Sequence, residues 1–493
     1  MICVSLARTR HRMVLAEHKA LAERGAELVE LRIDYLKTAP DVGRLLKDRP
    51  TPTVVTCRRP PDGGRWSGSE EQRLMLLRTA IISGAEYVDL EYDIAKKVPR
   101  YGKTKRIVSY HNFSETPDNV EEFYDLMTEC DPDVIKIVTT ANSPADCVRL
   151  LKIASGSKVP TIAFCMGEFG VMSRILCGKY GAPFTYATFS AERELAPGQL
   201  SFEEMRDLYH YDRINSETQL FGVLGDPIGH SLSPRLHNAA MAEIGFNGVY
   251  VPIRVAKDQL SGVLDAFEWL DFRGLSVTIP HKEAVAEKYA GGASQAVREI
   301  GAANTLYRDA GNAWQAENTD YQAAMDCLTL GLREGETFEG KRVLILGSGG
   351  VARAIALGLS KAGAVLQIAG RGSSKTAKLA EELGCRHVTW ENRGVEFADI
   401  LVNCTPVGMH PNMDDTPFQE NWLRDDMLVF DTIYNPENTL LLKQARAHGC
   451  RTVSGLEMFV RQAAGQFKLF TGHDAPLQTL GATLRRAISA ARY

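Results

Sequence analysis

The chain has 493 residues, of which 44% are hydrophobic and 24% are charged, a composition typical of globular proteins with about two to four domains. The formal net charge of −4 excludes the basic surface that nucleic acid or an anionic membrane would need, so a small-molecule substrate is expected. The ten cysteines occur singly, without C-x-x-C pairs, so we expect reduced thiols and no bound metal. With no leader segment or membrane-length apolar run in the sequence, a cytoplasmic location is predicted.

Short runs rich in Val, Ile and Thr alternate with amphipathic segments through the first half of the chain. The predicted strands are 2–6, 28–33, 53–58, 87–91, 106–111, 134–139, 161–166 and 184–189. The segments between them, such as 11–24, 70–83, 119–130 and 144–154, carry apolar residues at helical spacing. This alternation predicts a (β/α)₈ TIM barrel, in which the active site lies at the C-terminal ends of the strands.

One lysine lies inside a predicted strand of this barrel. Lys136 stands among β-branched residues in Val-Ile-Lys-Ile-Val. An ammonium group in a strand interior is costly unless it is paired or deprotonated, and a neutral lysine amine is a nucleophile for ketones. The alternative is a lysine on an edge strand with its head in water, and the strand pattern alone favours that alternative.

Other polar residues are predicted at the ends of the barrel strands. They are Glu30, Arg32, Arg58, Asp89, Glu91, His111 and Arg174. Ion pairs that close the barrel mouth would explain any one of them. Taken together with Lys136, they favour a ketone that also bears a carboxylate. The arginines would bind the acid, the lysine would form an iminium, and the histidine would move a proton.

Six motifs of the first half resemble, in the same order, those of type I 3-dehydroquinate dehydratases over residues 1–214. They are Glu-Leu-Arg-Ile-Asp, Val-Asp-Leu-Glu, Ser-Tyr-His-Asn-Phe-Ser-Glu-Thr-Pro, Val-Ile-Lys-Ile, Met-Ser-Arg and Ala-Pro-Gly-Gln. The resemblance implies that Lys136 is the Schiff-base lysine, His111 the general acid and base, and Glu91 the carboxylate that orients His111. It also implies substrate contacts by Ser5, Glu30, Arg32, Arg58, Arg174 and Gln199. Leu195 departs from the small hydroxyl residue common in that family, so the lid segment 185–195 has no assigned role.

A new domain is predicted to begin near residue 219, where a fresh strand and turn follow a polar stretch. Its candidate polar residues are Ser231, Ser233, Lys282, Asn304, Asp320 and Gln462. Helix capping is the alternative for the two serines and for Asp320. A turn is the alternative for Asn304, solvent exposure for Lys282, and a core amide bonded to the backbone for Gln462.

The segment 342–356 combines an apolar strand, a glycine turn and a helix. Gly347, Gly349 and Ala352 have the spacing of the G-x-G-x-x-A dinucleotide fingerprint, and Ser348, Gly350 and Val351 complete the turn. The next strand, 365–369, leads to Arg371, Ser373 and Lys375, where an enzyme specific for NAD would carry an acid. These residues favour the 2′-phosphate of NADP, although a basic loop can also be plain surface.

From residue 219 onward, the order of motifs resembles shikimate dehydrogenases. These motifs include His-Ser-Leu-Ser-Pro, Val-Thr-Ile-Pro-His-Lys, Gly-Ala-Ala-Asn-Thr-Leu, Asn-Thr-Asp and Gly-Ser-Gly-Gly. The resemblance implies an α/β substrate-binding domain at 219–324, completed by helices at 456–493, and a Rossmann NADP-binding domain at 325–455. It places Ser231, Ser233, Thr278, Asn304, Asp320, Tyr434 and Gln462 at the shikimate site. It further implies that Lys282 and Asp320 form the catalytic pair, and that Thr432 and Gly455 approach the cofactor.

The two halves together predict a fused enzyme. Its barrel would dehydrate 3-dehydroquinate to 3-dehydroshikimate, and its second half would reduce that product to shikimate with NADPH. One alternative joins a Schiff-base aldolase to a quinate dehydrogenase. Another is a ligand sensor that has lost catalysis, although the presence of Lys136, His111, Lys282 and Asp320 argues against it. Direct transfer of the intermediate between the two sites is a hypothesis prompted by the fusion.

Overall fold

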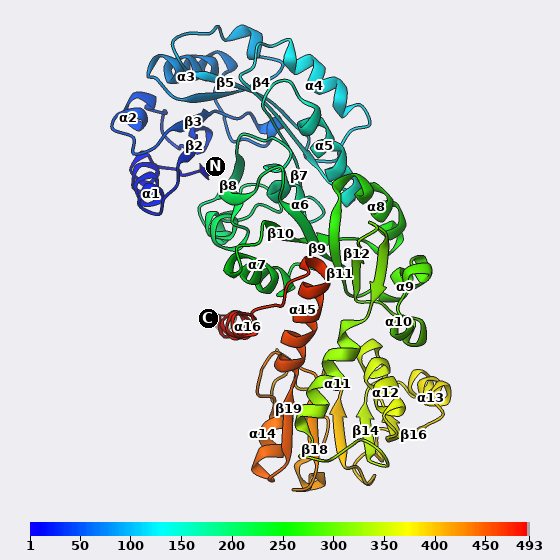
Figure 1. The fold of residues 1–493 in the computed structure, drawn as a ribbon. Helices are drawn as coiled ribbons and strands as arrows, with labels where there is room; N and C mark the ends of the chain where they lie inside the picture. Colours follow the sequence, from blue (N-terminus) through cyan, green and yellow to red (C-terminus); the bar gives the residue numbers. More distant parts are fainter. Residues whose placement is uncertain (491–493) are drawn as a thin grey trace. The chain divides into compact units, whose positions relative to one another are not determined.

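Figure 1 shows the computed structural model, which describes residues 1–490 except for the side chains of Ser373 and Ala490. The chain forms two compact units. The first contains residues 1–231 and 247–272, and the second contains residues 232–246 and the chain from residue 273 onward.

The first unit is built around an eight-stranded parallel sheet with the order β7-β6-β5-β4-β3-β2-β1-β8, a nearly closed barrel. Its strands are β1 (Ile2–Leu6), β2 (Leu28–Arg32), β3 (Thr53–Thr56), β4 (Tyr87–Glu91), β5 (Lys105–His111), β6 (Val134–Thr140), β7 (Thr161–Met166) and β8 (Thr185–Thr188). Nearly all of their residues are buried, as expected for a parallel sheet that is covered on both faces. The predicted TIM barrel is confirmed, with each strand end within about two residues of its predicted position.

Helices follow most of the barrel strands and surround the sheet (Figure 1). They are α1 (His11–Glu23), α2 (Val42–Leu46), α3 (Glu70–Ile82), α4 (Val120–Thr128), α5 (Pro144–Gly156) and α6 (Val171–Leu176). Capping boxes start two of them, formed by Ser69 with Gln72 at α3 and by Ser143 with Asp146 at α5. The short helices α2 and α6 lie outside the segments predicted from periodicity, because so few residues give little periodic signal.

The region after the barrel contains shorter elements. In the first unit, β9 (Gln219–Gly225) pairs in parallel with β10 (Gly248–Arg254), and α8 (Leu260–Ala266) follows. An antiparallel ladder comprises β11 (Phe272–Val277), β12 (Thr305–Arg308) and β13 (Trp314–Glu317). The helices of this region in the second unit are α7 (Ser233–Glu243), α9 (Lys282–Lys288), α10 (Gln295–Ile300) and α11 (Thr319–Gly331).

A six-stranded parallel sheet with the order β16-β15-β14-β17-β18-β19 forms the rest of the second unit. Its strands are β14 (Arg342–Leu346), β15 (Val365–Ala369), β16 (Arg386–Val388), β17 (Ile400–Asn403), β18 (Leu428–Asp431) and β19 (Arg451–Ser454). The helices are α12 (Gly350–Lys361), α13 (Ser373–Glu382), α14 (Leu440–Ala447), α15 (Gly455–Thr471) and α16 (Leu477–Ala490). The chain reverses direction across the sheet between β14 and β17, which is the switch point where doubly wound sheets bind nucleotides. The predicted Rossmann fold is confirmed.

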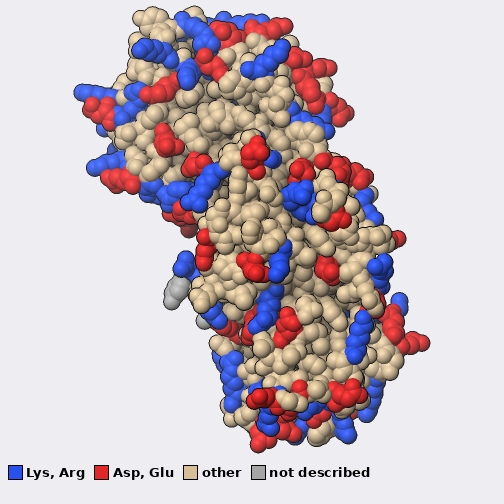
Figure 2. Space-filling view, in the orientation of Figure 1, with Lys and Arg blue, Asp and Glu red and all other residues tan. Residues whose placement is uncertain are grey.

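Basic and acidic side chains are interspersed over the face shown in Figure 2, in keeping with the small net charge. Within residues 1–490, no helix has the length and apolar character needed to cross a membrane. The same residues contain no group of three or more His, Cys, Asp or Glu side chains arranged to hold a metal ion.

Candidate active sites

The barrel brings together eight of the residues predicted for the first site. Ser5, Glu30, Arg32, Arg58, His111, Lys136, Arg174 and Gln199 line a single pocket. They meet because the parallel strands of a barrel end at the same rim and their inward-facing side chains converge there. Leu195, which was left without a role, lines the pocket as well.

Lys136 lies on an interior strand, because β6 is paired with both β5 and β7. Its side chain is only 7% exposed, so the alternative of a solvated edge lysine is wrong. The Nζ atom lies 3.3 Å from Oδ2 of Asp89 and 4.0 Å from the ring centroid of Tyr186. The lysine is therefore held between a carboxylate and an aromatic face at the side of the pocket.

His111 lines the same pocket and is enclosed by cations. Burial, together with the charges of Arg58 and Lys136, lowers its pKa well below the usual range. The imidazole is therefore neutral near pH 7 and able to accept a proton. Burial alone would favour the neutral acid of Asp89, but the same two cations hold the pKa of that carboxyl well below its usual range.

Beneath the pocket, charged side chains of alternating sign are linked by short contacts. Arg58 bonds Asp89 at 2.8 Å and Glu91 at 3.1 Å. Arg73, a fully buried residue of α3, bonds the other oxygen of Glu91 at 2.8 Å and Glu70 at 2.7 Å. We call this set the buried charge row; its members, in order, are Lys136, Asp89, Arg58, Glu91, Arg73 and Glu70, of which Glu70, 42% exposed, is the surface end. Each buried charge in it has an oppositely charged neighbour, as buried ions require.

Glu91 makes contacts that differ from the prediction. It was expected to orient His111, but its two oxygens are bonded to Arg58 and Arg73, and it does not line the pocket. The buried Nδ1 atom of His111 has no hydrogen-bond partner among the described residues. The carboxylate that acts electrostatically on His111 is that of Asp89. Two guanidinium groups saturate Glu91, so its direct effect is on the arginines rather than on the imidazole.

Arg174 is a buried cation in the pocket, and no carboxylate of the described residues forms a salt bridge with it. Its guanidinium lies 4.5 Å from the ring centroid of Phe164, its Nε atom has no partner in the described structure, and burial lowers its pKa to about 10. A guanidinium in this state is suited to bind an anionic group of a ligand. Arg32, in contrast, is already bonded by two nitrogens to Asp34, at 2.9 Å and 2.8 Å.

In the second unit, Lys282 and Asp320 are in direct contact, with 2.7 Å between Nζ and Oδ2. Lys282 is the first residue of α9, and Asp320 is the second residue of α11. The N-cap of α11 is Asn318, which accepts a hydrogen bond from the N–H of Tyr321. The capping alternative for Asp320 is therefore wrong, and its carboxylate is available to the lysine.

A hydrogen-bond network holds the start of α11. Asn304 donates from Nδ2 to the hydroxyl of Thr319 at 3.0 Å and accepts from the N–H of Thr319 at 2.8 Å. Gln466 of α15 donates to the carbonyl of Asn304 at 3.0 Å and accepts from the hydroxyl of Ser276 at 2.8 Å. The sequence reasoning did not single out Gln466. Its signal was a second amide four residues after Gln462, on the face of the helix whose other buried residues are apolar or glycine.

The remaining predicted substrate residues have varied surroundings. Gln462 donates to the carbonyl of Phe459 at 3.2 Å, the backbone contact that was its alternative. Tyr434 packs against the ring of Phe459 at 4.6 Å, and burial raises its pKa. The N-cap of α7 is Leu232, so neither Ser231 nor Ser233 occupies the capping position. Thr278 follows β11 directly and accepts a bond from the N–H of His281.

At two positions of the predicted dinucleotide site, the backbone leaves no room for a side chain. Gly347 has φ +113°, and a Cβ atom there would lie 2.9 Å from the carbonyl oxygen of Cys404. A Cβ atom at Gly455 would lie 2.4 Å from the carbonyl of Thr432. Gly455 and Thr432, the two residues predicted to approach the cofactor, are therefore neighbours in space. Ser348 and Gly349 lead into α12, whose first three residues are Gly350, Val351 and Ala352. This glycine turn before a helix can receive a pyrophosphate group.

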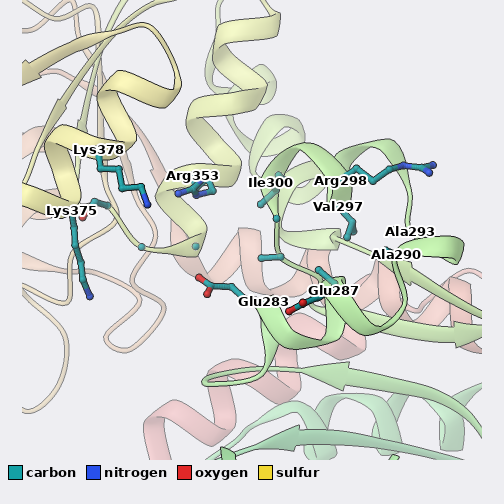
Figure 3. Close-up of a pocket in the computed structure, with 16 residues that line it drawn as sticks. Glu283, Glu287, Ala290, Ala293, Val297, Arg298, Ile300, Arg353, Lys375 and Lys378 are labelled. Atoms are coloured by element: carbon teal, nitrogen blue, oxygen red, sulfur yellow. The ribbon is translucent and has the colours of Figure 1, made fainter. Parts of the chain in front are cut away.

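A cavity of about 790 Å³ lies beside this turn, and Figure 3 shows the residues that line it. The start of α12 lines it together with Arg353, Lys375 and Lys378, and side chains of α9 and α10, including a fourth basic residue, Arg298, form the opposite wall. Lys375 was predicted to contact a 2′-phosphate, and Arg371 is exposed just before α13. The prediction for the hydroxyl of Ser373 concerns a side chain outside the described structure. Cations at the end of β15 fit a phosphorylated ribose better than a free 2′-hydroxyl.

A barrel with a buried lysine beside a neutral histidine has the groups for amine-based carbonyl chemistry, and a dinucleotide fold with a Lys–Asp pair has those of a reductase. One chain that holds both defines a bifunctional enzyme.

Comparison with known proteins agrees with this class. The profile of type I 3-dehydroquinase matches residues 2–216, and that of the shikimate dehydrogenase substrate binding domain matches residues 223–306. The profile of the shikimate 5′-dehydrogenase C-terminal domain matches residues 455–484, and a coenzyme F420-dependent NADP oxidoreductase profile matches 342–429. The bifunctional 3-dehydroquinate dehydratase/shikimate dehydrogenase of Arabidopsis thaliana, a chloroplastic protein, is 39% identical over 97% of this chain and 83% of its own length. The chain belongs to the family of bifunctional 3-dehydroquinate dehydratase/shikimate dehydrogenases.

Relatives of the second half alone are also similar. A shikimate dehydrogenase (NADP⁺) from Methanothermobacter thermautotrophicus is 38% identical over 56% of this chain and 99% of its own length. A crystal structure of a shikimate dehydrogenase with NADP⁺ is 34% identical, covers 56% of this chain and 97% of its own, and superposes with a TM-score of 0.52. A quinate dehydrogenase from Corynebacterium glutamicum in complex with NAD is 32% identical over 54% of this chain and 98% of its own, with a TM-score of 0.50.

Proposed function

We propose that this protein dehydrates 3-dehydroquinate to 3-dehydroshikimate in its barrel and reduces the product to shikimate with NADPH in its second half. The dehydratase comprises residues 1–214, the substrate-binding domain 219–324 with 456–493, and the NADP-binding domain 325–455. The observation that carries the proposal is the buried Lys136 beside Asp89 and the neutral His111, in a chain 39% identical over 97% of its length to a bifunctional relative.

In the barrel, the amine form of Lys136 attacks the ketone carbon of 3-dehydroquinate, and loss of water gives an iminium. The iminium acidifies the neighbouring C–H, whose proton passes to neutral His111, and an enamine forms. The enamine electrons then expel the hydroxyl group, which takes its proton from the same imidazole and leaves as water. A water molecule hydrolyses the remaining iminium and restores the lysine. Arg174 binds the substrate carboxylate, which supplies the negative charge that this buried cation lacks.

In the second half, bound NADPH supplies the hydride that reduces the ketone of 3-dehydroshikimate. Lys282 donates a proton to the developing alkoxide, and Asp320 holds the ammonium at 2.7 Å. The bonds from Asn304 to Thr319 fix the residue that precedes Asp320, which orients the carboxylate. Arg371 and Lys375 supply positive charge for the 2′-phosphate.

A quinate preference is the second candidate, because the quinate dehydrogenase noted above superposes about as well as the shikimate dehydrogenase. The basic residues at the end of β15 favour the NADP-dependent shikimate reaction. A cytoplasmic location completes the proposal and is supported by the ten free cysteines, which suit a reducing compartment.

Incubation of the protein with 3-dehydroquinate and NADPH tests the proposal. We expect NADPH to be oxidised and shikimate to appear by mass spectrometry. Lys136→Ala should form shikimate only from added 3-dehydroshikimate, and borohydride should trap substrate on the wild-type lysine but not on this variant. The absence of shikimate from the wild-type reaction would reject the proposal. Faster oxidation of quinate with NAD⁺ than of shikimate with NADP⁺ would favour the second candidate.

A further inference from the structure

Tyr186 is a pocket residue to which the proposed reaction gives no role. It lies on β8, its side chain is 3% exposed, and it lines the barrel pocket. Its hydroxyl is buried and has no hydrogen-bond partner within the described structure. A buried hydroxyl without a partner is unfavourable, so a native protein seldom keeps one unless a ligand or water completes it.

Two carboxylates in or beside the pocket already have partners, whereas Nδ1 of His111 and Nε of Arg174 have none among the described residues. Glu30 accepts bonds from Ser5 at 2.5 Å and from Thr56 at 2.7 Å. Asp89 accepts from Ser109 at 2.6 Å and pairs with Arg58. Burial raises the pKa of Tyr186 well above its usual range, so its hydroxyl stays protonated and can donate. The acceptor that would complete this group is an oxygen of a bound ligand.

The ring of Tyr186 has a separate contact. The Nζ atom of Lys136 lies 4.0 Å from its centroid, within the range of a cation–π interaction. Phe164 and Phe184 pack against the ring, with centroids 6.4 Å and 5.7 Å away, which fixes its orientation. The face of the ring attracts a cation but cannot accept a proton. It therefore stabilises the Nζ atom of Lys136 both as an ammonium and as an iminium.

We propose that Tyr186 is a further substrate-binding and positioning residue of the barrel site, whose hydroxyl donates to a ligand oxygen and whose ring supports the cationic nitrogen of Lys136. The inference rests on the proposed dehydratase function. The hydroxyl can be removed alone, and the ring can be removed together with it, so the two contributions are compared in sequence.

Two substitutions make this comparison. Tyr186→Phe keeps the ring and removes the hydroxyl, so KM for 3-dehydroquinate should rise roughly fivefold to tenfold with kcat within about twofold. Tyr186→Leu also removes the aromatic face, so borohydride trapping on Lys136 at saturating substrate should slow by roughly tenfold. The matched controls are Tyr87→Phe and Tyr87→Leu. Tyr87 belongs to the same barrel, has Lys105 5.6 Å from its ring, and is not part of the pocket lining.

Thermal unfolding and the reductase rate of the same chain show whether each variant is folded. An unchanged KM in Tyr186→Phe overturns the role of the hydroxyl, and unchanged trapping in Tyr186→Leu overturns that of the ring. Equal losses in the Tyr186 and Tyr87 variants indicate packing only and overturn both. If the wild-type chain forms no adduct on Lys136, the dehydratase proposal itself fails. A wild-type adduct together with unaffected Tyr186→Phe and Tyr186→Leu variants rejects only the present inference.

Discussion

Replacement of Arg73 by methionine would remove one member of the buried charge row. The guanidinium is fully buried and bonds Glu70 at 2.9 Å and 2.7 Å, Glu91 at 2.8 Å and the carbonyl of Cys57 at 2.8 Å. Loss of one partner from a buried ion pair costs about 3–5 kcal/mol, because the other charge remains buried. We expect the free energy of unfolding of the barrel to fall by this amount. The dehydratase kcat should also fall, since Glu91 then draws Arg58 from Asp89.

The two activities report on the two halves of the chain, which need not unfold together. In a urea titration, the midpoint for loss of dehydratase activity should fall by about 1–2 M in Arg73→Met, while the midpoint for reductase activity stays unchanged. Arg78→Met is the control, because Arg78 lies on the same helix and its side chain makes an exposed hydrogen bond to the carbonyl of Lys97. Adding Glu91→Gln to Arg73→Met should recover part of the loss. Equal shifts in the Arg73 and Arg78 variants would refute the reasoning.

Three further predictions concern single groups. Lys282→Ala should lower the reductase kcat by about 10²–10⁴ and spare the dehydratase, and an unchanged kcat would remove this lysine from the mechanism. Arg371→Gln combined with Lys375→Gln should raise KM for NADPH at least about tenfold and leave KM for NADH nearly constant; equal effects would contradict the 2′-phosphate role. Burial lowers the pKa of His18 from 6.5 to about 4. Between these two pH values, His18 is protonated in the unfolded chain and neutral in the folded chain. Stability should fall as the pH falls through this window, by up to about 1.4 kcal/mol per pH unit, and His18→Gln should flatten that slope in urea titrations near pH 7 and about pH 5.

The barrel and the Rossmann sheet could be predicted from the sequence because their strands are continuous apolar runs separated by amphipathic helices. Residues of the sites were predictable where a charge inside an apolar strand or a glycine turn marked them, as for Lys136 and Gly347. The spacing of residues along a strand shows to which face of the sheet a side chain points. It does not show which residue that side chain contacts. For this reason Glu91 was expected at His111, although the guanidinium groups of Arg58 and Arg73 occupy it.

Residues on other elements gave weaker signals. Arg73 lies in a helix whose charged residues look like a solvated face, and only the fold shows that this arginine points inward. Tyr186 appears in the sequence as an ordinary aromatic strand residue, because nothing local indicates that its hydroxyl lacks a partner. Gln466 was overlooked beside Gln462, since its partners, Asn304 and Ser276, are more than a hundred residues away.

The buried charge row begins at a lysine on β6 and ends on α3, a helix of the outer layer. Part of the catalytic environment is thus encoded outside the strands and loops that chimeric barrels usually exchange. A chimera that replaced α3 with a helix lacking Arg73 would keep every pocket-lining residue and still leave Glu91 with one cation instead of two. A chimera that is meant to preserve the buried charge row must therefore take α3 together with β3 and β4.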